Sequence, residues 1–333
     1  MINPWLQFIL CAAIIIIAGS KLTRSAAIVA ENTGIGTAWA GALMLPLATS
    51  LPELVTTLSA VFIDAPDLAM GNILGSCLFN LSLLAVIDLL EGRGPLTGRI
   101  NRGHIISASL SIITICLASI AMLGVVYLPI GWIGAETLLI ALVYIFGSRL
   151  VYRYEKKNLS PVPAGDDIGP TDTAVSTGRA LLHFSIAAGF IVVAGVWITG
   201  ASDRIALETG LGHTFIGSIL LAISTSLPET VTTITAVRLG FLDMAVANVF
   251  GANFMNLFIV FLADIFYRRA PLFYAVSENH LISAVMVVLI STIVIFGLIY
   301  RSEKKFCRIG YDTLLVLIAY MTAVFLLFKS GSN

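Results

Sequence analysis

Long apolar segments dominate the chain, and short polar segments separate them. Ten apolar segments are long enough for an α-helix that crosses a hydrocarbon layer of about 30 Å, which takes roughly 20 residues. They cover approximately residues 4–22, 36–63, 67–90, 103–123, 126–149, 178–200, 212–238, 243–266, 277–299 and 309–328. The pattern predicts an all-α membrane protein with ten transmembrane helices.

Composition supports a membrane protein and excludes a soluble one. Apolar residues make up 58% of the chain and charged residues 11%, with a mean hydropathy of +0.98. The formal net charge is zero, so we expect the lipid bilayer and small inorganic cations as partners, and no nucleic acid. No Lys or Arg precedes Trp5, so the first span is expected to be a retained helix rather than a signal peptide. Without CxxC spacing, the cysteines are expected to be reduced packing residues: Cys11, Cys77, Cys116 and Cys307.

The chain contains an internal duplication. Residues 45–57 recur as residues 221–233, with 9 of 13 positions identical and a constant offset of 176. The same offset relates Gly19 to Gly195, Gly75 to Gly251, Asn80 to Asn256 and Asp88 to Asp264. We therefore expect a first five-helix repeat at 1–151, a linker at 152–177 and a second five-helix repeat at 178–333.

An odd number of spans in each half has a topological consequence, because the second half must then enter the membrane from the opposite side. The repeats are thus predicted to be inverted. Of the 19 Lys and Arg residues, fifteen fall on one side of the predicted spans. The remaining four are Arg204, Arg268, Arg269 and Lys329. Because cytoplasmic loops hold the excess of positive charge, the linker is expected to be cytoplasmic and flexible, with both termini outside.

The second and seventh spans each carry a proline and a glutamate in their middle, at Pro52-Glu53 and Pro228-Glu229. Proline removes a backbone donor and frees carbonyl groups where no water can replace the lost bond. A carboxylate at mid-bilayer costs about 2.5–3.5 kcal/mol on insertion scales. Two such pairs at equivalent positions predict broken helices and a cation site at the membrane centre.

Hydroxyl groups precede both prolines, at Thr49-Ser50 and Thr225-Ser226. Together with the carboxylates they are hard oxygen ligands of the kind that Ca²⁺ and Na⁺ prefer. Such hydroxyls in membrane helices often bond only to backbone, and proline often only bends a helix. The glutamate after each proline, in both copies, favours the cation site.

The third and eighth spans add amide groups. Asn72, Ser76 and Asn80 follow at i, i+4 and i+8 and share one helix face, and the second copy keeps Asn248 and Asn256. Asn72 and Asn248 fit inter-helix hydrogen bonding and the cation site equally well. Asp88 and Asp264, near the ends of these spans, are expected to face an aqueous vestibule or to cap a loop. Gly75 and Gly251 allow close backbone approach or a break in the helix.

These motifs resemble the α-repeats of the cation/Ca²⁺ exchanger superfamily, most closely its prokaryotic Na⁺/Ca²⁺ exchanger branch. The resemblance implies a midplane ion site among broken second, third, seventh and eighth helices, with alternating access. It also implies that the first and sixth helices slide, where Gly19 and Gly195 lie, and that carbonyls near Pro46 and Ala222 complete the shell. The implied metal ligands are Glu53, Glu229, Thr49, Ser50, Thr225, Ser226, Ser76, Asn80 and Asn256.

Three departures from the family pattern involve four positions. Ala48 and Ser224 stand where a glycine is usual, Ala252 stands where relatives carry serine, and Asn256 stands where some carry aspartate. Two carboxylates neutralise one Ca²⁺, whereas two or three Na⁺ leave the site at zero or +1. Protons could also neutralise the glutamates, because neighbouring carboxylates resist full ionisation together.

The predicted function is a Ca²⁺/Na⁺ antiporter that acts as a monomer without a cofactor. The alternative is an H⁺-coupled exchanger of Ca²⁺ or another divalent cation, and a cation channel is a further one. An enzyme is not expected, because the chain has no HExxH pair and only His183 among its histidines lies deep in a predicted span. The short linker, in which we expect Asp166 and Asp167 to be solvated, favours a prokaryotic plasma membrane.

Overall fold

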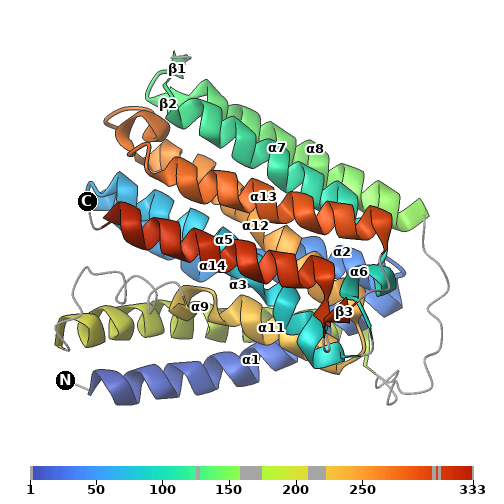
Figure 1. Cartoon of the computed structure of the whole chain (residues 1–333). Helices are drawn as coiled ribbons and strands as arrows, with labels where there is room; N and C mark the ends of the chain where they lie inside the picture. Colours follow the sequence, from blue (N-terminus) through green and yellow to red (C-terminus); the bar gives the residue numbers. More distant parts are fainter. Residues whose placement is uncertain are drawn as a thin grey trace. The chain divides into compact units, whose positions relative to one another are not determined.

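The computed structural model describes residues 3–92, 94–124, 128–157, 175–208, 223–301, 305–306 and 309–331. These ranges are helical, apart from two hairpins of two-residue antiparallel strands (Figure 1). The elements of the first half are α1 (Pro4–Thr33), α2 (Thr37–Trp39), η1 (Ala40–Met44), α3 (Leu45–Thr49), α4 (Leu51–Phe62), α5 (Pro66–Glu91), α6 (Leu96–Arg99), α7 (His104–Met122), β1 (Pro129–Ile130), β2 (Ile133–Gly134) and α8 (Ala135–Lys157). Those of the second half are α9 (Thr177–Glu208), α11 (Leu227–Arg238), α12 (Leu242–Phe266), η2 (Leu272–Ala275), α13 (His280–Tyr300), β3 (Lys305–Phe306), β4 (Ile309–Gly310) and α14 (Tyr311–Gly331).

Eight described helices are long and apolar enough to cross a membrane, and a bent pair, Thr37–Thr49 with Leu51–Phe62, makes up to nine. Nine of the ten predicted spans thus have a helical counterpart in the described ranges. The seventh span is described only from residue 223 onward, and its earlier residues lie outside these ranges. The linker residues 158–174, which include Asp166 and Asp167, and Cys307 also lie outside them.

Two compact units make up the chain, and each combines segments of both halves. The first contains Met1–Pro52 and Ser148–Ala252, and the second contains Glu53–Gly147 and Asn253–Asn333. This division differs from the division at the linker. The five-helix repeats and their inversion stay predictions from the duplicated sequence.

In the first unit α1 and α9 lie side by side and antiparallel (Figure 1). The Gln7 side chain donates to the Trp197 carbonyl near one end of the pair, and Asn32 donates to the Val175 carbonyl near the other. The apolar core of the pair consists of Cys11, Ile15, Ala194 and Ile198. An antiparallel pair is what inversion requires of the first and sixth spans.

In the second unit α13 packs against α5, α7 and α14 (Figure 1). The strands β1 and β2 pair just before α8, and β3 and β4 pair just before α14. Both hairpins therefore sit at the start of a predicted span. Their positions in the two halves differ by the same 176 residues as the duplicated motifs.

Several helix bounds differ from the sequence prediction. The first helix was expected to end near residue 22, yet α1 continues to Thr33, where Gly34 ends it with a φ of 66°. The fifth helix was expected from residue 126 but begins at Ala135, after the β1–β2 hairpin. The polar residues after residue 20 predict the end of the first helix there. They do not end it, because a helix can continue beyond the hydrocarbon layer.

The prediction that the third and eighth helices are broken is wrong. Both α5 and α12 are continuous, because each glycine costs only about 1 kcal/mol in a helix and neither helix has an internal proline. Gly251 instead allows the backbones of α12 and η1 to approach each other closely. A Cβ atom at this position would lie 2.1 Å from the Ala42 carbonyl oxygen of η1.

Asp88 and Asp264 are fully buried and hold hairpins, which confirms the loop-capping alternative. Asp264 accepts hydrogen bonds from the Gly134 amide at 2.8 Å, the Thr137 hydroxyl at 2.5 Å and the Leu272 amide at 2.6 Å. Asp88 accepts one from the Gly310 amide at 2.8 Å. Thr313 and Leu96, which also interact with Asp88, are the counterparts of Thr137 and Leu272. We call the two arrangements the aspartate clasps.

We predict that Gly251→Ala strongly destabilises the protein, because its methyl group would overlap the Ala42 carbonyl. The matched control is Gly75→Ala, where a Cβ atom meets nothing within 4 Å. That change should be neutral or stabilise by about 0.5–1 kcal/mol through helix propensity. Thermal unfolding of both purified variants in detergent measures the difference. Equal melting temperatures would contradict the backbone contact.

We also predict that Asp264→Ala lowers the thermal stability, because it leaves buried donors without an acceptor at about 1–3 kcal/mol each. Melting followed by intrinsic fluorescence gives the shift. Glu278→Ala is the control, since this carboxylate is exposed. A melting temperature like that of the control would show that the clasp carries no stability.

Candidate functional site

The broken second helix and the start of α11 share one backbone conformation. α3 and α4 meet at Ser50 with a bend of 43°, and Ser50 has φ −85° and ψ 9°. Ser226, just before α11, has φ −89° and ψ 10°. The cause is the proline two residues later, which cannot donate a helical hydrogen bond. A π-helical turn, η1, precedes the first break, and such turns are frequent at functional sites.

Two glutamates enter the first turn of the helices that follow these breaks. Glu53 in α4 is 0% exposed and Glu229 in α11 is 1% exposed. A helix N-terminus favours a negative charge through its free amide groups and its dipole. The breaks therefore stabilise both carboxylates where the sequence places them.

In the first unit, the hydroxyl of Ser50 donates to Glu229 Oε1 at 3.0 Å. No described residue forms a hydrogen bond with Glu229 Oε2, although this atom is buried. A buried carboxylate oxygen without a partner is costly unless a cation or a proton meets it. This atom is the clearest sign of a ligand in the first unit.

The other predicted hydroxyl ligands of the first unit are also buried. Thr49 donates to the Leu45 carbonyl at 3.1 Å, a backbone bond within its own helix, and keeps its lone pairs for other contacts. Thr225 and Ser226 are each 0% exposed. Ser224 contacts Ser202 of α9 at 2.6 Å.

The second unit contains Glu53 and the three remaining predicted ligands, Ser76, Asn80 and Asn256, all 0% exposed. The Asn80 amide donates to Asn253 Oδ1 at 3.2 Å, and Asn253 donates to the Cys77 carbonyl at 3.1 Å. The Oδ1 atoms of Asn80 and Asn256 have no hydrogen-bond partner among the described residues. They are available as neutral oxygen ligands.

Asn253 was missed by the sequence reasoning. It occupies the position equivalent to Cys77 in the first copy. Because a thiol and an amide are different functional groups, comparing the two copies showed no repeated motif at this position. In the structure the two residues contact each other through the Asn253 amide and the Cys77 carbonyl. Asn253 therefore orders the amide of Asn80 rather than repeating a ligand.

Asn72 and Asn248 share two equivalent contacts in their respective units, and Asn248 also donates to Thr232 at 3.0 Å. Asn72 donates to the Glu53 carbonyl at 3.4 Å and to Thr57 at 3.1 Å. Asn248 donates to the Glu229 carbonyl at 3.4 Å and to the equivalent threonine, Thr233, at 2.9 Å. Both asparagines thus make inter-helix hydrogen bonds that fix the turn carrying a glutamate.

These asparagines also keep a free acceptor. Neither Asn72 Oδ1 nor Asn248 Oδ1 has a hydrogen-bond partner among the described residues. The repeated segments 45–57 and 221–233 end at Thr57 and Thr233, and that repetition was the available signal for these contacts. Sequence reasoning gave the two threonines no role.

Gly19 and Gly195 lie where α1 and α9 pass the helices after the breaks. A Cβ atom at Gly195 would lie 2.4 Å from Pro52 Cγ, and one at Gly19 would lie 2.8 Å from Val231 Cγ1. Both contacts lie within the first unit. Any larger residue would push the long helices away from the broken ones.

The described residues contain no cluster of three or more His, Cys, Asp or Glu side chains. The candidate ligands are carboxylate, hydroxyl and amide oxygens. Such a set suits Ca²⁺ and Na⁺ and does not suit the nitrogen- and sulfur-rich sites of zinc or copper.

Comparisons with known proteins agree on one family. The model of the family described as sodium/calcium exchanger protein matches residues 3–151 and 179–330. The sodium/calcium exchanger MaX1 of Methanosarcina acetivorans is 26% identical over 324 residues, covering 88% of this chain and 93% of the relative. The uncharacterized membrane protein MJ0091 of Methanocaldococcus jannaschii is 26% identical over 285 residues, covering 85% and 84%.

Solved structures show the same fold. One structure of the sodium-calcium exchanger NCX_Mj, soaked with Na⁺ and Sr²⁺, has a TM-score of 0.73 at 18% identity. The alignment covers 97% of this chain and 97% of that chain. The two stretches that the family model matches include both proline-glutamate motifs and nearly the whole of each half, so this chain belongs to the sodium/calcium exchanger protein family.

Proposed function

We propose that this member of a cation exchanger family is a secondary antiporter that exchanges Ca²⁺ for Na⁺ by alternating access. The observation that carries the proposal is the buried Glu229 carboxylate, which accepts from Ser50 through one oxygen and has no described partner for the other. An anion enclosed in this way in a membrane span is stabilised by a bound cation. The duplicated sequence assigns Glu53 the same role.

The proposed ligands are the nine residues predicted from the sequence. Glu53 and Glu229 supply the charge, and the hydroxyl and amide groups supply neutral oxygens. Two carboxylates neutralise one Ca²⁺, so Ca²⁺ occupancy leaves no net charge in a low-dielectric region. Na⁺ ions that replace it compete for the same oxygens, and competition for one set of ligands is what couples the two fluxes.

Alternating access would come from α1 and α9. Gly19 and Gly195 present no side chain to Val231 and Pro52, and flat contacts of this kind permit sliding along the broken helices. We place this exchanger, as a monomer, in a prokaryotic plasma membrane because its linker is short. The distribution of Lys and Arg puts both termini outside and the linker in the cytoplasm.

A second candidate is H⁺-coupled exchange of Ca²⁺ or another divalent cation. Ala252 and Asn256 are both 0% exposed. The family resemblance implies a hydroxyl at the first position and, in some members, a carboxylate at the second, and this chain offers neither. Fewer ligands weaken Na⁺ binding, while a proton needs only one carboxylate oxygen such as Glu229 Oε2. The same transport experiment separates the two couplings.

The test is ⁴⁵Ca²⁺ uptake into proteoliposomes that contain Na⁺, that have an acidic interior, or that have no gradient. We expect uptake to follow internal Na⁺ and to stall without a gradient. Glu53→Gln and Glu229→Gln should each lower uptake at least about 10-fold, because an interaction with a charged group contributes about 1.5–3 kcal/mol.

Glu31→Gln is the matched control, since Glu31 is an exposed carboxylate on α1 and should tolerate the change. Uptake that requires only an acidic interior would show that H⁺, and not Na⁺, is the coupling ion. Flux without any gradient would indicate a channel. Full activity in both glutamine variants would disprove the proposed site.

Ser50→Ala provides a finer prediction. Removing the hydroxyl deletes one oxygen ligand and the 3.0 Å bond that orients Glu229, so the apparent KM for Ca²⁺ should rise roughly 3- to 10-fold. Ser59→Ala is the control, because this exposed hydroxyl only donates to the Val55 carbonyl of its own helix. Initial uptake rates against Ca²⁺ concentration measure the change, and an unchanged KM would remove Ser50 from the ligand set.

A further inference from the structure

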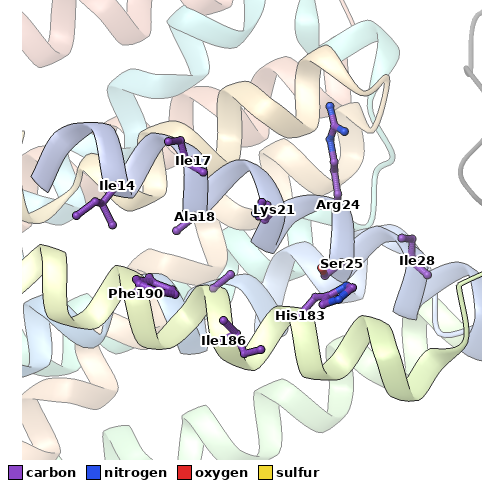
Figure 2. A pocket seen from close by; sticks show the side chains of 11 residues that line it. Ile14, Ile17, Ala18, Lys21, Arg24, Ser25, Ile28, His183, Ile186 and Phe190 are labelled. Atoms are coloured by element: carbon purple, nitrogen blue, oxygen red, sulfur yellow. The ribbon is translucent and has the colours of Figure 1, made fainter. Parts of the chain in front are cut away.

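A groove of about 520 Å³ runs between α1 and α9 in the first unit, away from the breaks (Figure 2). Its size falls within the range of about 300–1,000 Å³ typical of pockets for small ligands. Nothing in the proposed exchange uses it. The lining residues are Ile14, Ile17, Ala18, Lys21, Arg24, Ser25, Ile28, His183, Ile186, Ala187 and Phe190.

The body of the groove is apolar and open to the surroundings of the helix pair. Ile17, Ile186 and Phe190 are each at least half exposed, although both helices belong to predicted spans. In a membrane, such a surface faces acyl chains. The groove follows the helices, and its α1 side from Ile14 to Ile28 is about 21 Å long at 1.5 Å per residue.

Polar groups gather toward one end. Lys21 lies about 26 Å along α1 from Pro4, near the far edge of a hydrocarbon layer about 30 Å thick. Figure 2 shows His183 of α9 pointing toward Ser25 of α1, while the Arg24 side chain extends away from α9. The groove therefore changes along its length from an apolar part to a basic part.

No described acidic residue lines the basic part of the groove. Neither Lys21 nor Arg24 forms an ion pair with a described residue, and no lining residue is acidic. Arg179, exposed on the first turn of α9, adds a further positive charge near this end. Glu31, one turn beyond Ile28 on α1, is the nearest carboxylate in that helix and does not line the groove.

We propose that this groove binds an anionic phospholipid, with one acyl chain along Ile14, Ile186 and Phe190 and the phosphate beside Lys21. An anionic phospholipid combines an extended apolar chain with a negative head at the depth of the lysine. Basic pockets between membrane helices are a general site for such headgroups. The site does not depend on which ions the protein exchanges.

Native mass spectrometry of the purified full chain tests the proposal, with phosphatidylglycerol and phosphatidylcholine of identical acyl chains as probes. Phosphatidylglycerol should be retained preferentially. Lys21→Gln should lower that preference about five-fold, the effect of one basic residue near an anionic surface. Arg24→Gln is a second variant in case Lys21→Gln folds poorly, which size-exclusion chromatography reveals.

Two further variants separate a defined site from general attraction. Arg149→Gln removes an exposed charge on α8 that does not line the groove, and it should leave the preference unchanged. Ile186→Trp fills the apolar part and should reduce the retention of both lipids. Equal retention of the two lipids by the native chain, or an Arg149→Gln loss equal to that of Lys21→Gln, would overturn the proposal.

Discussion

A carboxylate enclosed in a membrane span is the constraint on which the rest of this structure depends. It needs a preceding helix break that exposes amide groups, a donor that orients one oxygen, and a neighbouring helix that fixes the turn. Glu229 has all three: the break at Ser226, the hydroxyl of Ser50 and the Asn248 amide on its backbone carbonyl. The oxygen that remains, Oε2, has no hydrogen-bond partner among the described residues, and the proposed cation would meet it.

The two halves hold their buried glutamates with the same local backbone geometry, even where their sequences differ. The serines at the breaks agree within a few degrees in φ and ψ, and Asn72 and Asn248 donate to the same pair of acceptors. The differences lie in the polar groups beside the glutamates. Ala252 and Asn253 replace Ser76 and Cys77 of the first copy, so the two copies share a backbone but offer different side-chain groups at these positions.

The sequence correctly predicted helical spans, the break at Ser50 and the burial of both glutamates. These features were predictable because a proline or a charged side chain in the middle of a membrane span is tolerated in only a few arrangements. Sequence reasoning failed for α5 and α12, since a glycine that permits a break also permits close approach, and only the neighbouring backbone decides. Gly251 contacts Ala42, whereas Gly75 has open space.

Side-chain partners were the least predictable part. Thr57 and Thr233 stood in the repeated segment, but only the structure shows that they receive the asparagine amides. The residues that line the α1–α9 groove could not be predicted from the sequence either. Lys21 and Arg24 entered the sequence analysis only through the predicted orientation of the first span, and nothing in the linear pattern placed Lys21 in one groove with His183.

The aspartate clasps bear on how such a chain could have arisen. Asp88 of the first half holds the hairpin at Gly310 of the second, and Asp264 of the second half holds the hairpin at Gly134 of the first. If two identical copies of one segment were joined in a single chain, each copy would supply the aspartate for the hairpin of the other, which is the reciprocal arrangement seen here.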